Sequence, residues 1–247
     1  SYRAGDTINI SATSSEALVS GSKVAVTLET GSVDQVVVLT RDSADATLLV
    51  GTYTVQSGDT SSDLNVASFA LGASGNGVPV DLAGNLMTST TVPSSPYNVA
   101  DVKALVIDTS APTISASIAA NTNDTTPSVS VTASDTLSGL VNGSLKIDVD
   151  LNNDGDFADV GEANYATGTL TAGAATIDLS TLAEGSHKLQ ARVSDAAGNE
   201  GVSSVSTFNV DTTAPTILSF SSTKADGSYK AGDTINISAT SSEALVS

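Results

Sequence analysis

The sequence of 247 residues has no cysteine, no tryptophan and a single histidine. Without cysteine the chain cannot form disulfide bonds or use thiolate chemistry, and with one histidine a zinc site is disfavoured. A hydrolytic triad needs a base held beside its nucleophile. The one histidine, His187, stands between Ser186 and Lys188, which predicts a strand end facing solvent. No serine lies in a G-x-S-x-G motif. The sequence therefore predicts a protein that is not an enzyme.

Basic residues are scarce: Lys and Arg total 9 against 27 Asp and Glu, a formal net charge of −18. Such a surface repels phosphate, so we expect no nucleic-acid partner, whereas cations are attracted. No apolar run approaches the length of a membrane-spanning helix, and the first residues do not read as a signal peptide. We therefore expect no membrane span in this sequence, and any export signal outside it.

The sequence repeats itself. Residues 1–20 and 228–247 agree at 19 of 20 positions, and the difference is Arg3 against Lys230. Near-identity at a long fixed offset indicates tandem duplication. A shorter repeat is the segment Asp108-Thr-Ser-Ala-Pro-Thr113, which recurs as Asp211-Thr-Thr-Ala-Pro-Thr216. Proline restricts its own φ and the residue before it, so both segments are predicted to be extended linkers.

These linkers divide the chain. Residues 1–110 are predicted to form one domain that lacks its own first strand, and residues 111–213 a second domain. Residues 214–247 are predicted to be the first strands of a further repeat. The strand missing from the first domain is expected to resemble residues 214–228.

Apolar and polar residues alternate with a period of two in the segments 8–12, 24–29, 129–133, 145–150 and 189–194. This period predicts strands with one face in a core and the other, including Asp148 and Asp150, in water. Turn signals such as Asn142-Gly143 separate the segments. Short strands at this spacing predict an all-β fold of tandem Greek-key β-sandwich domains.

The densest acidic segment is Asp148–Glu162, with the sequence DVDLNNDGDFADVGE. Its D-x-N-x-D-G core is typical of a calcium loop, since Ca²⁺ prefers six to eight oxygen ligands. The flanks predict strands, so we expect this loop inside a β-hairpin. The candidate Ca²⁺ ligands are Asp148, Asp150, Asn152, Asp154, Asp156, Asp159 and Glu162. The alternative is a polar hairpin tip without metal.

A second acidic set is dispersed. The pattern D-x-A-G-N occurs at residues 81–85 and 195–199, each time before a linker aspartate. An acidic residue also follows the second predicted strand of each domain. If these loops meet at one pole of a sandwich, their carboxylates would repel one another unless a cation lay among them. We therefore predict calcium at the domain junctions, bound by Asp81, Asn85, Asp108, Asp135, Asp195, Asn199, Asp211 and Glu16. The alternative is that D-x-A-G-N is only a turn closed by Asp and Asn.

The DTSAPT and DTTAPT linkers, the D-x-A-G-N turns and the DVDLNNDGDF hairpin resemble bacterial immunoglobulin-like repeats. Such repeats fill the extender regions of giant secreted adhesins of Gram-negative bacteria, often exported by type I secretion. The resemblance implies an immunoglobulin-like fold, an extracellular location at the bacterial surface and Ca²⁺ at linkers and loops. It places that Ca²⁺ on the hairpin and on Asp81, Asn85, Asp108, Asp195, Asn199 and Asp211.

The function expected from these observations is a structural spacer stiffened by calcium, with neighbouring repeats as its partners. Two alternatives remain. One is an adhesin module that binds a glycan or a host protein, and the other is a subunit of an extracellular filament or surface layer. In the filament reading, residues 214–247 pack onto the first domain of another chain by strand donation, or else stay poorly ordered.

Overall fold

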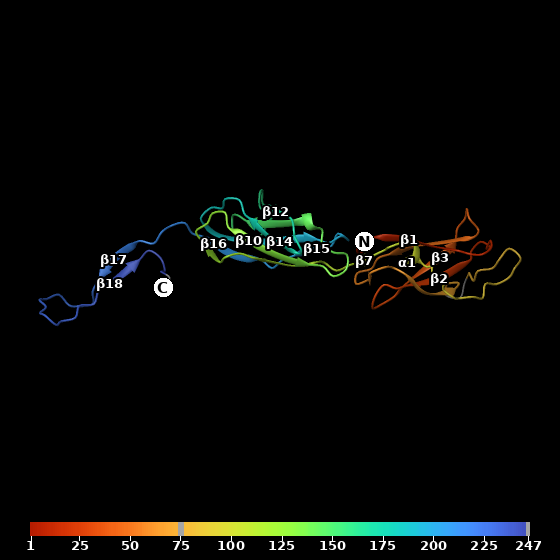
Figure 1. Cartoon of the computed structure of the whole chain (residues 1–247), viewed down its shortest axis with the longest axis horizontal. Helices are drawn as coiled ribbons and strands as arrows, with labels where there is room; N and C mark the ends of the chain where they lie inside the picture. The colour runs from red at the N-terminus through yellow and green to blue at the C-terminus, as the bar shows by residue number, and fades with distance from the viewer. Residues whose placement is uncertain (74–76, 246–247) are drawn as a thin grey trace.

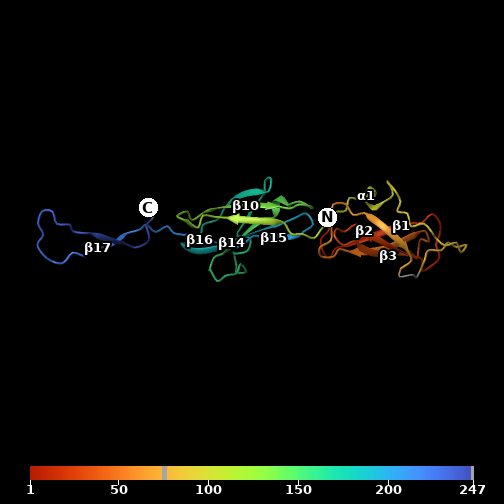
Figure 2. The ribbon, with the colours of Figure 1, turned by 90° about the horizontal axis from the view of Figure 1, so that it is seen from below.

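The computed structural model describes residues 1–73 and 77–245. Its parts follow one another along one long axis, with the first domain at one end and residues 214–245 at the other (Figure 1, Figure 2). The first domain contains β1 (Thr7–Thr13), β2 (Lys23–Leu28), β3 (Gln35–Arg41), β4 (Leu48–Thr54), β5 (Thr60–Ser61), β6 (Val66–Leu71), α1 (Val99–Val102) and β7 (Ile107–Asp108). The second contains β8 (Thr113–Ser117), β9 (Asn121–Thr122), β10 (Ser128–Ser134), η1 (Asn142–Ser144), β11 (Leu145–Asp150), β12 (Ala166–Gly168), β13 (Ala174–Asp178), β14 (Gly185–Ser194), β15 (Glu200–Val202) and β16 (Ser206–Val210). The last part contains β17 (Ile217–Ser221) and β18 (Ser238–Ser241).

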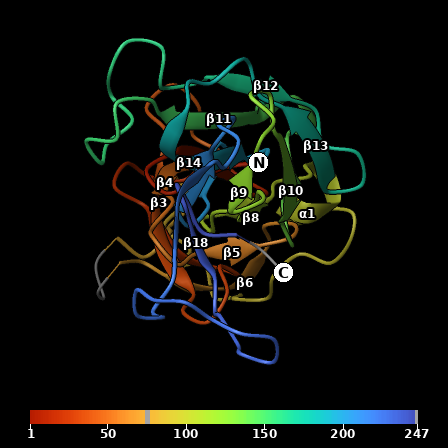
Figure 3. The ribbon, with the colours of Figure 1, turned by 90° about the vertical axis from the view of Figure 1, so that its left-hand side faces the viewer.

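The second domain is a sandwich of two sheets. One sheet has the order β13-β10-β8, and the other the order β12-β11-β14-β16-β9, with β15 also paired to β14. After β10 the chain crosses to the other sheet at β11, returns at β13 and crosses again at β14, which is the Greek-key connectivity of immunoglobulin-like domains. Seen along the long axis, β10 and β13 lie to one side of β11 and β14 (Figure 3). The predicted all-β sandwich fold is confirmed.

The first domain is built on a curved sheet with the order β1-β4-β3-β2-β6, and β5 and β7 form a separate antiparallel pair. Strand β3 pairs with β2 along its length but with β4 only through Thr40↔Val50 and Arg41↔Leu49, so the sheet turns around its core at β3. β1 and β6 are the edges of this sheet. The core runs from Ile8 to Ile107, whereas that of the second domain runs from Ile114 to Val210.

The two-residue periodicity places the apolar side chains of these strands in the cores. Ile8 and Ile10 in β1 are 6% and 3% exposed, and Leu145, Ile147 and Val149 in β11 are fully buried. The expectation that the polar face of β11 lies in water was wrong for Asp148 and Asp150, which are 1% and 0% exposed. Polar side chains of the neighbouring strand β14 cover them.

The prediction that His187 faces solvent was also wrong. Its side chain is buried, and its Nε2 lies 2.9 Å from the carbonyl oxygen of Ala183. Its ring centroid lies 5.6 Å from that of Phe208. His187 is the third residue of β14, where the inward-facing positions begin, so it takes part in packing.

Residues 214–245 lie beyond the second domain, away from the first (Figure 1). β17 and β18 form an antiparallel pair whose side chains are mostly exposed. This segment is therefore not folded back on the first domain of its own chain. In the described part of the chain, no helix has the length and apolar character needed to cross a membrane.

Candidate metal centres

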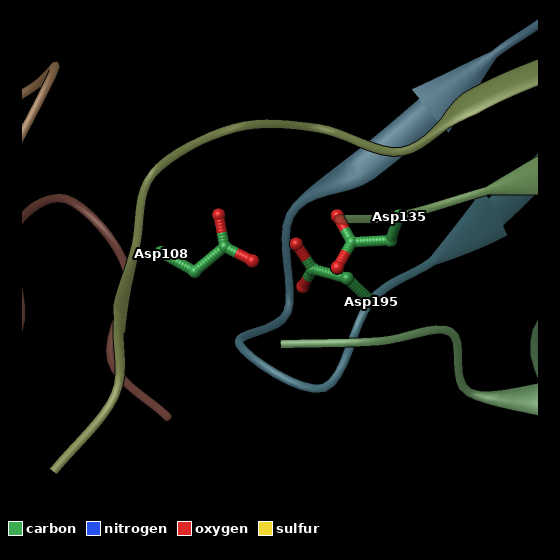
Figure 4. A group of neighbouring side chains, drawn as sticks. All are labelled: Asp108, Asp135 and Asp195. Carbon is green, nitrogen blue, oxygen red and sulfur yellow. The ribbon is translucent and has the colours of Figure 1, made fainter. Parts of the chain in front are cut away.

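Three aspartates meet where the two domains join. Each of Asp108, Asp135 and Asp195 offers a carboxylate oxygen within 4.8 Å of the oxygens of the other two (Figure 4). Asp108 ends β7 of the first domain and opens the linker, Asp135 follows β10, and Asp195 follows β14. All three come from the predicted set. Two oxygens that bind one Ca²⁺ at about 2.4 Å can lie up to about 4.8 Å apart, so this spacing suits a shared cation.

Hydrogen bonds hold Asp108 against the second domain. Its Oδ2 accepts from the backbone N–H of Ser138 at 2.9 Å, and its Oδ1 accepts from that of Ser110 at 3.0 Å. Its main-chain carbonyl accepts from Nδ2 of Asn199 at 2.9 Å. The residue is 1% exposed, although it lies between two domains. The linker aspartate is thus part of the second domain's loop cluster.

The D-x-A-G-N pattern forms the same turn twice. Asp195 Oδ1 accepts from the backbone N–H of Asn199 at 2.8 Å, and its Oδ2 accepts from Nδ2 of Asn199 at 2.7 Å. Both of the corresponding bonds join Asp81 to Asn85 at 2.7 Å. The glycine of each turn has φ near 90°, which favours glycine. D-x-A-G-N therefore forms a turn closed by Asp and Asn. These hydrogen bonds do not use all the lone pairs of the carboxylate, because each oxygen has two.

The electrostatics of the junction favour a cation. The ion pairs found among the described residues join Asp148, Asp150 and Glu200 to basic partners and include none of the junction aspartates. The basic side chain of Arg3 reaches the same turn but donates to the carbonyl of Gly198. Ser138, whose backbone N–H donates to Asp108, has a buried Oγ without a hydrogen-bond partner in the described structure. An unpaired buried hydroxyl in a residue that contacts one of the three aspartates suits an oxygen-ligated ion.

The same elements form two partial versions of this group elsewhere. In the first domain, Glu16, Asp81 and Asn85 line a small hollow of about 130 Å³. The backbones of Leu18 and Asp81 form an isolated antiparallel β-bridge there, as those of Leu140 and Asp195 do in the second domain. The two groups of loops therefore correspond. Asp211 opens the second linker and accepts from the N–H of Thr213 at 3.1 Å, as Asp108 does from Ser110. A linker aspartate, an acid that follows β10 and the aspartate of a D-x-A-G-N turn come together at Asp108, Asp135 and Asp195.

The predicted hairpin joins β11 to β12, with residues 151–165 as its loop. Asp150 Oδ2 accepts from the N–H of Gly155 at 3.0 Å, whereas its buried Oδ1 has no partner in the described structure. Glu162, also buried, accepts from the N–H of Leu151 at 2.8 Å. Asn152 connects the remaining acids, since its Nδ2 donates to Asp154 and Asp159, and Asp156 accepts from Ala158 within the loop.

Burial alone would raise the pKa of Asp150, but hydrogen bonds from the N–H groups of Gly155 and Asn153 and from Lys188 hold it below its ordinary value. Asp150 is therefore charged at neutral pH, with one carboxylate oxygen bonded to the loop at Gly155. Among the described residues, no three acidic oxygens of this loop are as close together as those of the junction. The hairpin is thus the looser of the two candidate sites.

Asp148 does not share the arrangement of the other hairpin residues. Both of its oxygens accept from Arg192, at 2.6 and 2.9 Å, and it also accepts from Gln190 and from the N–H of Asn164. Burial would raise its pKa, but these donors, Arg192 first, lower it below the ordinary value. A carboxylate held by an arginine fork has little capacity left for a metal.

Two contributors to the junction had no separate signal in the sequence. Ser138 provides both an N–H to Asp108 and the unpaired Oγ. Arg3 donates from Nη1 to the carbonyl of Gly198 at 2.7 Å, from the first domain to the turn of the second. The one sequence feature that relates Arg3 to a domain boundary is its place near the start of the repeated segment 1–20.

No protein-family model and no curated protein matches the chain. Among solved structures, it is similar to fibronectin(III)-like modules of CbhA from Clostridium thermocellum, with 16% identity, a TM-score of 0.31 and coverage of 85% of this chain and 86% of that one. It is also similar to a tetra-tandem repeat in the extending region of a large adhesion protein, with 22% identity and a TM-score of 0.34. That match covers 96% of this chain and 53% of the other, so the chain spans about half of that structure's length.

Proposed function

We propose that this chain is a spacer of a bacterial surface adhesin, in which calcium at the junction carboxylates makes successive β-sandwich domains one stiff rod. The observation that carries the proposal is the meeting of Asp108, from the first domain and its linker, with Asp135 and Asp195 of the second. A bound cation there has ligands on both sides of the boundary. It therefore couples the orientation of the domains.

The direction of the effect follows from charge. Three carboxylates close together repel one another, and the chain as a whole carries a net charge of −18. Without a cation, the repulsion favours separation of Asp108 from the other two and a freer linker. A divalent cation bound among the three carboxylates attracts each of them and outweighs their mutual repulsion. It also stabilises the folded form by mass action, by about 2.7 kcal/mol at a hundredfold excess over the dissociation constant.

The adhesin assignment rests on the linkers and turns of the sequence and on the tandem arrangement of its domains. Units that contact only their neighbours form extended arrays, and a stiff array holds a distal binding domain away from the cell. The location we propose is extracellular. A second, local role for calcium is proposed at the hairpin, with Asp150, Asn152, Asp154, Asp156, Asp159 and Glu162 as ligands and the buried, unpaired Asp150 Oδ1 as the best placed atom.

Small-angle X-ray scattering of the chain with Ca²⁺ and with a chelator tests the proposal. We expect a longer maximum dimension and a narrower distance distribution with Ca²⁺, because the junction then holds one orientation. The variant Asp195→Asn keeps the size of the side chain but removes one charge from the cluster, and it should behave in Ca²⁺ as the parent does in chelator.

The matched control is Asp81→Asn, measured like the others at a concentration at which the chain is monomeric. It makes the same change in the same turn of the first domain, away from the linker aspartate Asp108. It should keep the full response to Ca²⁺. Thermal melting confirms that both variants fold. Identical scattering of the parent chain with and without Ca²⁺ would remove the proposed stiffening.

A further inference from the structure

An apolar hollow of about 500 Å³ opens between the two edges of the sheet in the first domain. Ile10–Thr13 of β1 and the following Ser14 form one side, and Val66 and Phe69 of β6 another. Met87, residues 91–93 and residues 97–99, from the segment that leads into α1, also line the hollow and cover part of it. Its floor is the core itself, at Val24, Val26, Leu39 and Leu49. Among the described residues, β1 pairs along its length with β4 on one side only. An edge strand beside an open core is a template for a further strand.

The second domain shows what fills the corresponding place there. β8 pairs with β10 and sets Ile114 opposite Ala133. Ile114 is 8% exposed and belongs to the core. β8 follows the linker Asp108–Thr113 directly. β17 follows the second linker in the same way, and its Ile217 corresponds to Ile114.

β17 has the apolar residues for this role and does not bury them. Ile217, Leu218 and Phe220 are 52%, 65% and 73% exposed. Residues 212–223, which contain β17, and residues 7–15, which contain β1, have no charged side chain. In a chain this acidic, two neutral strands can meet without repulsion. An isolated two-stranded hairpin is marginally stable in water, so β18 is a weak competitor for β17.

The structure already contains the pairing of this donor with the acceptor sequence. β18 repeats residues 11–14, the end of β1 and the residue after it, without change. β17 pairs with β18 so that Phe220 faces Ala239 and Ile217 faces Ser241. The equivalent partners are Ala12 of β1 and the following Ser14, which both line the hollow and are half-buried, whereas Ser11 and Thr13 are exposed. Directly opposed residues of an antiparallel pair lie on the same face of the sheet. The same register on β1 therefore directs Phe220 and Ile217 into the hollow.

We infer that β17 of one copy of this chain docks on β1 of a second copy and closes its first domain, so that copies join head to tail. The docking deepens the proposed function, because it also brings Asp211 of the donor to the loops of Glu16 and Asp81 of the acceptor. This reproduces the arrangement of Asp108, Asp135 and Asp195. A junction between copies would then contain the same cation site as the junction within the chain.

Engineered cysteines test the docking directly, since the chain has none of its own. Ser219 faces Thr240 in the pair β17–β18, and the equivalent of Thr240 on β1 is Thr13. One preparation carries Ser219→Cys and another Thr13→Cys, and the two are mixed under mild oxidation. Opposed residues of antiparallel strands are about 4.5–5.5 Å apart at Cα, within the range of a disulfide bond. We expect a covalent heterodimer.

The control is a donor that also carries Phe220→Asp, compared with one that carries Leu218→Asp. In this register Phe220 is directed into the hollow. Leu218 lies where the register of β17 shifts, between Ile217 and Ser219, and has no directly opposed residue. We expect Phe220→Asp to weaken association about tenfold or more, and Leu218→Asp to do so less. Failure to form the heterodimer, or equal yields from all donors, would overturn the inference.

Calcium separates this inference from the proposed function. If both hold, Ca²⁺ increases the heterodimer yield, and Asp211→Asn in the donor removes that increase. If the docking holds but the junction cation does not, the yield is the same with Ca²⁺ and with chelator. If docking itself fails, neither condition gives the heterodimer, whereas scattering of the single chain still responds to Ca²⁺.

Discussion

Residues 1–20 and 228–247 are almost the same peptide in two surroundings. In the first copy, residues 7–13 form a strand paired along its length with β4, and Ile8 and Ile10 are 6% and 3% exposed. In the second copy, only Ser238–Ser241 are in a strand, and Ile235 and Ile237 are 48% and 69% exposed. Leu18 and Leu245 differ in the same way, at 4% and 63%. One substitution, Arg3 against Lys230, cannot account for this contrast.

The difference shows that the alternating pattern needs a partner to become a full strand. β4 and the core behind it supply hydrogen bonds and apolar contacts to the first copy, whereas the second has β17 alone. Strand preference mainly reflects packing against neighbours and weakly reflects the backbone itself. The second copy therefore shows how little strand structure these residues form when they pair with β17 alone and have no core to pack against.

Hydrogen exchange should show the largest effect. The backbone N–H groups of residues 7–13 are expected to exchange with the global opening of the first domain, while those of residues 234–240 exchange almost freely. Because global opening of a domain costs several kcal/mol, the equivalent amides should differ in rate by roughly a thousandfold or more. Similar rates at Ile10 and Ile237, measured by NMR, would contradict the comparison.

A paired substitution tests the same contrast energetically. Ile10→Ala removes buried methyl groups and should destabilise the first domain by about 2–5 kcal/mol, a fall in its melting temperature of about 8 °C or more. Ile237→Ala removes the same atoms from an exposed site and should change stability by less than about 0.5 kcal/mol. Calorimetry that resolves the domain transitions decides the matter. A large loss from Ile237→Ala would mean that the second copy is packed in solution.

The smallest effect is expected at the position that differs. Arg3→Lys keeps the charge but loses the planar guanidinium that donates to Gly198 across the domain boundary, whereas Lys230→Arg changes an exposed residue without such a contact. We expect Arg3→Lys to cost about 0.5–1 kcal/mol at most and to loosen the orientation of the two domains. Residual dipolar couplings of the two domains provide the readout. Equal inter-domain order in both variants would assign no role to the arginine.

The parts of the fold that depend on local pattern could be predicted from the sequence. The two-residue alternation located the core residues of β1, β2, β10, β11 and β14, because side chains of a strand point alternately to its two faces. Proline located the extended linkers. The D-x-A-G-N pattern predicted turns, and the fixed hydrogen-bonding capacity of Asp and Asn explains why both copies close in the same way.

What depends on long-range packing could not be predicted. Burial of Asp148 and Asp150 follows from the alignment of β11 with Lys188, Gln190 and Arg192 of β14, which is a matter of strand order and register. Of the dispersed acids, the structure gathers Asp108, Asp135 and Asp195, and it places Glu16 beside Asp81 in a separate hollow. The sequence indicated the residue types and loops, but which acids share a site depends on where each loop ends.

The hydrogen bond from Asn199 to the carbonyl of Asp108 has a consequence for how an array of such units can evolve. Every residue type carries a main-chain carbonyl, so this contact does not depend on which side chain occupies the linker. Linker positions other than the aspartate can therefore differ, as Ser110 and Thr213 do, without loss of this contact. Selection on overall reach could then act by adding or deleting whole units.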